Sequence, residues 1–461
     1  MVVRFIWTLL FLFCTDQLVH AQSKVKLLDT FLTSQHLNGT FNGNILLAEK
    51  GKIIYQNSFG FANETTHELL RPEHLFDLGS LSKQFTAMAI VMLKEQGKLS
   101  FDDPMTKYIP ELKKYPVITI KNLLQHTSGF PDYLRLDTLF DRSIYNTNND
   151  LIKVYKAQPI KLLFTPESRH EYSNTNYVFL ASIIEKASGM TYDAFLLRFI
   201  FKPLKMKNSF VYRSRYKPET ITKVSKGYIY SDSLKRYIIP DSLPGYKKVF
   251  YFDGLYGDGA IYSNIADLFK WDRALYTNQL ITKKSMEEMF SPSQLSLKGL
   301  YPYGYGWRVQ DDPRYGKIVS HEGTWGGFNT LIERQIDSDK TIIILLNNNR
   351  SVFPVSVCRR VLYGHPLPND RTVSNALLTE YTGVYRLSSD ATMNIFISGN
   401  NLMAQATGDE QPVPIYFTTE NRFFRYDHDV ELEFVSDKNK KVTNLILYLN
   451  GKRFKDLLKT E

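Results

Sequence analysis

A serine and a lysine near residue 80 have the spacing that nucleophilic catalysis requires. Ser80 and Lys83 are three residues apart, so on a helix they share one face and the amine can reach the hydroxyl. A lysine buried near the positive N-terminus of a helix can act as the base that activates such a hydroxyl. The same spacing also begins at Ser23 and Ser214, but only Ser80 precedes an apolar, helix-like segment. We therefore predict Ser80 as nucleophile and Lys83 as base; the alternative is that Ser80 only caps the helix.

A tyrosine and an asparagine in a later loop could serve the same reaction. Tyr172 and Asn174 follow Pro166 and stand immediately before a predicted helix. A tyrosine there could exchange protons with Lys83, and an asparagine could orient a substrate amide. Tyr-x-Asn also begins at four other tyrosines: Tyr55, Tyr262, Tyr276 and Tyr448. Tyr172 is preferred over these four because of its position in the loop before the helix. The alternative is that the Tyr172 ring only packs as a loop anchor.

A His-x-Gly motif occurs once, at His321 and Gly323, where a predicted strand ends. The glycine would let a substrate lie against the strand edge, and the histidine could donate a hydrogen bond to a carboxylate or a carbonyl. The alternative is that His321 is a strand-end residue whose hydrogen bonds are satisfied within the fold.

Three motifs thus follow one another along the chain: Ser80-x-x-Lys83, Tyr172-x-Asn174 and His321-x-Gly323. In type and order they resemble the motifs of class C serine β-lactamases, D-Ala-D-Ala carboxypeptidases and related esterases, over roughly residues 41–362. The resemblance implies that Ser80 is acylated and that Lys83 and Tyr172 move protons. It also implies that backbone N–H groups of Ser80 and Thr324 stabilise the oxyanion. The residues expected to contact the substrate are Asn174, His321, Gly323 and Thr324.

The third motif departs from class C β-lactamases, which carry Lys-Thr-Gly, a tripeptide that this sequence lacks. A histidine there resembles certain carboxypeptidases, D-aminopeptidases and esterases. We therefore expect a secreted serine hydrolase acting through an acyl-Ser80 intermediate on peptide, amide or ester substrates. The alternatives are a β-lactamase and a catalytically inactive binding or scaffold protein of the same fold. We expect no metal or cofactor, because no His-Glu-x-x-His and no Gly-Lys-Ser or Gly-Lys-Thr occurs.

The elements that must position these motifs can also be predicted. Apolar, branched residues at 44–48 and 53–58 predict a β-hairpin. Apolar residues three and four apart predict one helix after Ser80 and another over 176–187. Consecutive strands are predicted at 317–321, 329–335 and 341–346. Helices in the middle and strands at both ends predict an α/β (α+β) sandwich, an antiparallel sheet with helices, which the resemblance makes β-lactamase/transpeptidase-like.

The chain is expected to divide near residue 365. A closing helix is predicted at 354–362, and 366–376 has the composition of a linker. From 377 to 461, short β-type runs alternate with turn signals such as Asn450-Gly451, which predicts a small C-terminal all-β domain. The serine hydrolase domain is therefore predicted at 22–365.

The first 21 residues have the layout of a secretory signal peptide. Arg4 precedes an apolar stretch over 5–13, and a cleavage site follows Ala21. Asp16 interrupts the apolar run well before the roughly 20 residues that a membrane anchor needs, so an anchor is the lesser alternative. We therefore predict an exported protein, periplasmic or extracellular, with no stable membrane span once 1–21 is removed.

Composition narrows the partners further. The formal net charge of +10 favours a solvated basic surface and could favour anionic cell-envelope polymers. No dense Lys/Arg run with interleaved aromatic residues occurs, so nucleic-acid binding is not expected. The expected partner is a small-molecule, peptide or cell-wall substrate, and the oligomeric state stays open. Signal cleavage would remove Cys14 and leave Cys358 without a disulfide partner in the chain.

Overall fold

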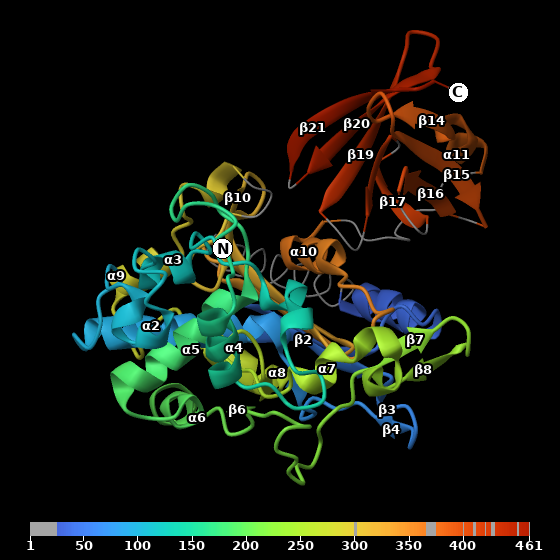
Figure 1. The fold of residues 1–461 in the computed structure, drawn as a ribbon. Helices are drawn as coiled ribbons and strands as arrows, with labels where there is room; N and C mark the ends of the chain where they lie inside the picture. Colours follow the sequence, from blue (N-terminus) through green and yellow to red (C-terminus); the bar gives the residue numbers. More distant parts are fainter. Residues whose placement is uncertain are drawn as a thin grey trace, which may run out of the picture. The chain divides into compact units, whose positions relative to one another are not determined.

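The computed structural model describes residues 25–298, 302–365, 375–399, 401–408, 412–419, 421–425, 429–449 and 451–460. The predicted signal peptide at 1–21 and the part of the predicted linker up to 374 lie outside these residues. The chain forms two compact units, both drawn in Figure 1. The larger unit comprises Gly39–Asp311 and Gly316–Ser351, and the smaller unit comprises Met1–Asn38, Asp312–Tyr315 and Val352–Glu461.

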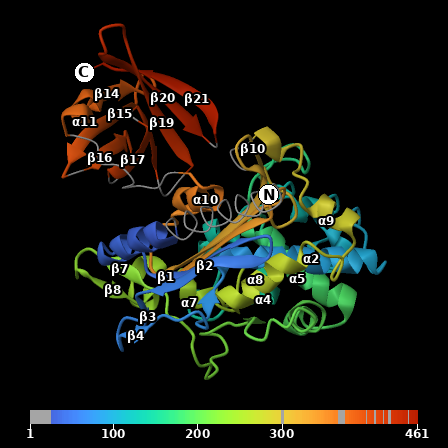
Figure 2. The same cartoon turned by 180° about the vertical axis from the view of Figure 1, so that it is seen from behind.

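The larger unit is built on a six-stranded sheet of order β10-β11-β12-β13-β1-β2. The strands are β1 (Gly43–Glu49), β2 (Lys52–Phe59), β10 (Arg308–Asp312), β11 (Gly316–Trp325), β12 (Phe328–Gln335) and β13 (Lys340–Leu346). Neighbouring strands run antiparallel from β11 to β2, and β1 pairs with β13 in the register Ile45↔Ile344. The predicted hairpin and the three late strands are thereby confirmed. The first and last strands of the unit meet in the middle of the sheet, which Figure 2 shows from the side of β1 and β2.

Helices cover this sheet and supply most of the core. They are α2 (Lys83–Glu95), α3 (Ile120–Leu124), α4 (Asn148–Ala157), α5 (Asn174–Ser188), α6 (Tyr192–Leu196), α7 (Lys248–Tyr251), α8 (Ile265–Ala274) and α9 (Lys283–Met289). Helix α8 packs on β13 and β1, and α2 packs on α5. Every residue of α2 from Lys83 to Leu93 is buried, because α2 is apolar around most of its circumference and lies in the centre of the unit. Helix α5 ends at Gly189, whose left-handed φ of 71° closes it. Both predicted helices are confirmed.

Short strands complete the larger unit. They are β3 (Phe61–Asn63), β4 (Glu68–Leu69), β5 (Phe76–Asp77), β6 (Phe210–Val211), β7 (Ile229–Ser231), β8 (Arg236–Ile238) and β9 (Ile261–Ser263). Strands β5, β9 and β6 form a small sheet of order β5-β9-β6. Strand β5 leads, through Leu78, into the 3-10 turn η1 (Gly79–Ser82), so this small sheet fixes where the predicted nucleophile begins.

The smaller unit is an eight-stranded antiparallel meander. Its strands are β14 (Gly383–Arg386), β15 (Thr392–Ser398), β16 (Asn401–Ala406), β17 (Val413–Thr419), β18 (Arg422–Arg425), β19 (Val430–Ser436), β20 (Val442–Leu449) and β21 (Lys452–Leu458). The first and last strands meet, because Tyr385 bridges Lys459 and the Thr460 N–H donates to the Val384 carbonyl at 2.8 Å. The meander therefore comes close to a closed barrel.

Side chains fill the interior of this barrel. Helix α11 (Asn375–Tyr381) contributes Leu378 and Tyr381, and the Tyr381 ring lies 4.6 Å from that of Phe434. A helix over 25–37 and α10 (Val355–Tyr363) also belong to this unit. The predicted fold class, a sandwich of helices and an antiparallel sheet with a small all-β domain, is confirmed. No helix in the described part of the chain is long and apolar enough to cross a membrane.

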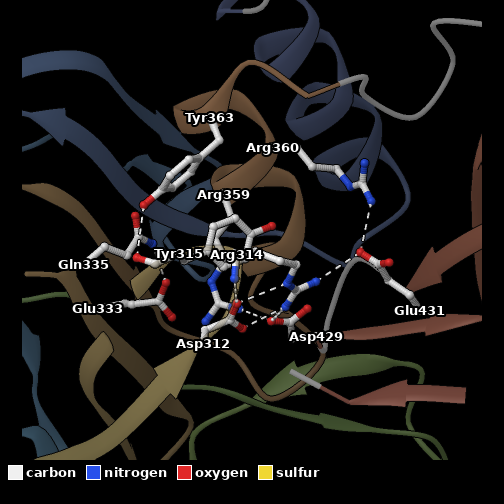
Figure 3. A network of polar contacts seen from close by, with 10 residues as sticks. All are labelled: Asp312, Arg314, Tyr315, Glu333, Gln335, Arg359, Arg360, Tyr363, Asp429 and Glu431. Carbon is white, nitrogen blue, oxygen red and sulfur yellow. Dashed lines mark hydrogen bonds and ion pairs between the residues drawn. The ribbon is translucent and has the colours of Figure 1, made fainter. Parts of the chain in front are cut away.

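Arginines and carboxylates of the smaller unit form a network of ion pairs, and Figure 3 draws them among other polar residues. Arg314 lies 2.9 Å from Asp312 and 2.5 Å from Asp429. Arg314 also lies 3.1 Å from Glu431, while Arg359 pairs with Asp429. The Asp429 side chain is 12% exposed and the Arg359 side chain 6%. Because burial removes most of the water around these charges, each charge depends on its ion-pair partners for stabilisation.

Removal of the Asp429 charge should therefore destabilise the smaller unit. Asp429→Asn leaves Arg314 and Arg359 without a shared counter-ion, and breaking a buried pair in this way costs about 3–5 kcal/mol. Thermal unfolding of the full chain, followed by circular dichroism, should show a lower melting temperature. The matched control is Asp456→Asn, which breaks the exposed pair with Arg453 and should change little. Equal melting of the two variants would contradict the importance of the network.

Candidate active site

The structure brings the predicted nucleophile and base into contact. Ser80 lies in the turn η1, and Lys83 is the first residue of α2. The Lys83 Nζ lies 3.0 Å from the Ser80 Oγ, and the Lys83 side chain is fully buried. Such a short contact is what proton transfer from the hydroxyl to the amine requires.

The other partners of Lys83 orient its amine. The Nζ donates to the Asn174 Oδ1 at 2.7 Å and to the Asp258 backbone carbonyl at 2.8 Å. Both oxygens can only accept, so they take two N–H groups of the amine and leave its remaining position directed at the Ser80 hydroxyl. The three contacts therefore make Lys83 suitable as a base for Ser80.

Asn174 is itself held by an aspartate. Its backbone N–H and its Nδ2 both donate to the Asp132 Oδ2, at 3.0 and 2.8 Å. This fixes the amide orientation, with the oxygen at Lys83 and the nitrogen at Asp132. Asp132 also caps the 3-10 turn that begins at Tyr133.

Tyr172 joins the same group through its ring. The ring centroid lies 5.1 Å from the Lys83 Nζ and 4.4 Å from the ring of His126. His126 is fully buried and accepts the Ser173 N–H at Nδ1, at 3.2 Å. Burial holds the pKa of His126 well below its usual value, so it stays neutral and anchors the loop that carries Tyr172.

His321 lies behind the site. It is 1% exposed, and its ring nitrogens contact the Tyr303 hydroxyl at 2.8 Å and the Glu322 carbonyl at 2.6 Å. Burial is the main cause that holds the pKa of His321 well below its usual value, so the ring is neutral. His321 is not among the residues that line the cavity at Ser80. The geometry makes it a positioning residue, held by Tyr303, and favours the alternative of a satisfied strand-end histidine over direct contact with the substrate.

In the structure, the glycine at position 323 has a different role from the one expected from the sequence. A Cβ at Gly323 would lie 1.9 Å from the Leu78 carbonyl oxygen and 2.6 Å from the Thr330 Oγ1. The Thr330 hydroxyl donates to the same carbonyl at 2.7 Å. The missing side chain thus allows β11 to lie directly against the segment that leads into Ser80.

This close approach also brings Thr324 to the nucleophile. Gly79 has a left-handed φ of 51°, and a Cβ there would lie 2.9 Å from the Thr324 backbone nitrogen. The residue before the nucleophile therefore lies directly against the backbone of Thr324.

A cavity of about 70 Å³ opens at Ser80. Asn174 and Thr324 line it, and aromatic rings of Tyr133, Phe252 and Trp325 form apolar walls. Three carboxylates also line it: Asp77, Asp253 and Asp258. None of these three aspartates was identified from the sequence as a candidate site residue.

A serine hydroxyl beside a buried lysine amine is the arrangement of a serine hydrolase that forms an acyl-enzyme. Residues 26–362 match the Beta-lactamase family model, and residues 367–458 match a domain of unknown function, DUF3471. The chain therefore belongs to the Beta-lactamase family, and it is a serine hydrolase.

Individual relatives agree with this assignment. Penicillin-binding protein 4* of Bacillus subtilis (strain 168) is 36% identical over 443 residues, 93% of this chain and 98% of that protein. Teichoic acid D-alanine hydrolase of Staphylococcus aureus (strain MRSA252) is 28% identical over 338 residues, 70% of this chain and 74% of that protein. The octameric penicillin-binding protein homologue from Pyrococcus abyssi has a similar fold, with a TM-score of 0.66 and 23% identity over 94% of this chain and 100% of that chain.

Asp77 makes the stability of the fold depend on pH. Burial raises the pKa of Asp77 to about 7 from 3.8, although the Gly79 N–H opposes this by donating to Oδ1 at 2.9 Å. Between these two values the folded protein holds a proton that the unfolded chain has released. The contribution of Asp77 to the free energy of unfolding therefore falls as the pH rises from about 4 to about 7.

Asp77→Asn should remove this dependence. Because the amide is neutral at every pH, the variant should melt higher than the wild type at pH 8, with a smaller difference at pH 5. The measurement is a pair of melting curves at each pH, with the exposed Asp102→Asn as control. A difference that is the same at both pH values would contradict the raised pKa of Asp77.

Proposed function

We propose that this protein is an exported serine hydrolase that works through an acyl-Ser80 intermediate on peptide, amide or ester substrates. The observation that carries the proposal is the 3.0 Å contact between the Lys83 Nζ and the Ser80 Oγ, with the amine oriented by two acceptors. The predicted signal peptide supports export.

In the proposed reaction the Ser80 Oγ attacks the substrate carbonyl carbon while Lys83 takes the hydroxyl proton. The oxyanion is stabilised by the N–H groups of Ser80 and Thr324. The carbonyl-to-leaving-group bond breaks, and the leaving group receives the proton from Lys83 through Tyr172. Water then attacks the ester at Ser80, releases the acid and restores the hydroxyl. Asn174 positions both Lys83 and the substrate.

The substrates that best fit are D-alanyl amides and esters. One relative, which this chain matches over 74% of that relative's length, is a teichoic acid D-alanine hydrolase. In addition, the third motif of this chain has His321 in place of a lysine. Both points favour D-alanyl substrates over β-lactams. His321 supports the site through Tyr303 in this proposal.

A turnover panel tests the substrate class. It compares nitrocefin, a D-Ala-D-Ala peptide, a D-amino-acid amide and a short-chain nitrophenyl ester under the same conditions. We expect turnover of the ester and of at least one D-alanyl substrate, with nitrocefin the slowest. Nitrocefin as the fastest substrate would instead support a β-lactamase.

A separate experiment tests export. The full chain is expressed with its own N-terminus in a bacterial host, and the N-terminal residue of the mature protein is determined. We expect a protein that begins at Gln22 in the exported fraction, whereas an uncleaved N-terminus would contradict the predicted signal peptide.

A further inference from the structure

A second and larger cavity adjoins the one that contains Ser80. Its volume is about 390 Å³, and all the residues that line it belong to the larger unit. Asp77, Tyr212 and Trp325 line both cavities. Because the two cavities share these three residues, a substrate whose carbonyl lies at Ser80 can extend into the larger one.

Aromatic and aliphatic side chains form much of the wall of the larger cavity. The ring of Tyr262 lies 5.2 Å from that of Tyr212 and 6.4 Å from that of Phe328. Tyr262 and Phe328 are both buried, so neighbouring side chains hold their rings in place. The other apolar side chains of the wall are those of Ile221, Val224, Ile239 and Trp325. A wall of this kind favours apolar groups, because their burial removes apolar surface from water.

The charges that line this cavity are largely neutralised within the protein. The Arg215 Nε and Nη2 lie 2.5 and 2.7 Å from Asp241, and its Nη1 lies 3.2 Å from Asp253. Burial raises the pKa of Asp77 to about 7, although the charge of Arg215 acts in the opposite direction, so this carboxyl is mostly neutral at pH 6. Lys226 also lines the cavity, but its side chain is exposed to solvent. A neutral ligand therefore fits this cavity better than a charged one.

One hydroxyl of the wall is still open to a hydrogen bond. Ser225 lines the larger cavity and is 2% exposed, and its Oγ has no hydrogen-bond partner within the described structure. An apolar group that enters the cavity therefore breaks no hydrogen bond within the protein at Ser225. Because a hydroxyl can donate and accept, an amide within an otherwise apolar group would satisfy it.

The groups that transfer protons indicate which part of the substrate enters this cavity. In the proposed reaction the leaving group receives its proton from Lys83 through Tyr172, and neither residue is among those that line the larger cavity. The leaving group must lie on the side of Lys83 and Tyr172, whereas the larger cavity is reached past Tyr212 and Trp325. The acyl group, which stays bound to Ser80, is therefore the part that extends into it.

We propose that the larger cavity is an acyl-binding site, which takes a neutral and mostly apolar group several bonds away from the carbonyl at Ser80. This inference rests on the proposed acyl-Ser80 hydrolase and specifies its acyl group. That group is longer than a single alanyl residue and carries an apolar chain, ring or peptide residue at its far end. The bond changes at Ser80 are those of the proposed reaction, and the distant group takes no part in them.

The test compares p-nitrophenyl hexanoate with p-nitrophenyl acetate at pH 6. The leaving group is the same in both, and the readout is the ratio of their kcat/KM values, because a general loss of activity cancels in it. Each buried methylene group contributes about 4-fold, so we expect the wild type to prefer the hexanoate by about 10- to 100-fold.

Two substitutions that fill the cavity from different segments test its role. Val224→Trp and Ile239→Trp should each lower the ratio at least about 10-fold, as expected when about two methylene groups lose their burial. The control is Val117→Trp, at a side chain that is 65% exposed and lines neither cavity, which should leave the ratio unchanged. Labelling of Ser80 by a fluorophosphonate confirms that each variant is folded.

A lower ratio in either labelled Trp variant of the cavity supports the acyl-binding site. A wild-type ratio near 1, a preference for the acetate, or an unchanged ratio in both variants would overturn this site while leaving the acyl-Ser80 hydrolase in place. Turnover of neither ester, in a protein whose Ser80 is still labelled, would also overturn only the acyl-binding site. A protein with neither ester turnover nor labelling would overturn the proposed function as well.

Discussion

Replacement of Lys83 by alanine should lower the rate of Ser80 acylation by about 10²- to 10⁴-fold, the usual contribution of a positioned general base. The Nζ is the group 3.0 Å from the Ser80 Oγ. Acylation is best followed as the single-turnover rate of labelling by a fluorophosphonate, since that step precedes any deacylation.

The controls must separate chemistry from folding. Lys83 is buried, and its loss leaves the Asn174 Oδ1 and the Asp258 carbonyl without this donor, at a cost of about 1–3 kcal/mol for each. Melting curves must therefore accompany the rates. Lys83→Arg gives a second variant, because a guanidinium still donates hydrogen bonds but cannot act as a base. Lys94 is on the same helix but at the surface, where its Nζ lies 3.7 Å from Glu288. In Lys94→Ala, Ser80 should therefore be labelled at the wild-type rate. Wild-type labelling of folded Lys83→Ala would contradict the role of Lys83.

Gly323→Ala should damage both the fold and the site. The added Cβ would overlap the Leu78 carbonyl oxygen at 1.9 Å, which forces β11 away from the turn that presents Ser80. Overpacking of this kind costs about 1–3 kcal/mol, and a 1 Å displacement of a reacting group can cost about 10²-fold in rate. We therefore expect a lower melting temperature and a kcat/KM for a short ester reduced about 10²-fold.

Gly245→Ala is the matched control for this substitution. A Cβ at Gly245 meets nothing within 4 Å, so its melting temperature and its kcat/KM should equal those of the wild type. If Gly323→Ala behaved like Gly245→Ala, the close packing of β11 against Leu78 would not matter to the site.

The sequence was sufficient for the elements whose periodicity is strong. The hairpin at 44–58, the helix after Ser80 and the strands β11, β12 and β13 all form where apolar spacing predicted them. Strands β17, β18 and β21 and helix α11 were missed. Strand β21 shows why, since the residues of Lys452–Leu458 are mostly exposed and charged and lack an apolar alternation.

The candidate site was predicted in part for a similar reason. Motif spacing identified Ser80, Lys83 and Asn174, which the structure brings into contact. Spacing could not show that both ring nitrogens of His321 are occupied, because Tyr303 comes from a different segment and meets it only in the folded chain. Asp77 escaped notice because a lone aspartate in an apolar stretch has no motif, and its cavity is formed by segments far apart in the sequence.

The central claim is that Ser80 forms the acyl-enzyme, and the most direct test is labelling of the folded protein with a fluorophosphonate followed by mass spectrometry of its peptides. The account predicts one adduct, on the peptide that contains Ser80, and its loss in Ser80→Ala. An unlabelled Ser80 in folded protein, or an equal adduct in Ser80→Ala, would contradict it.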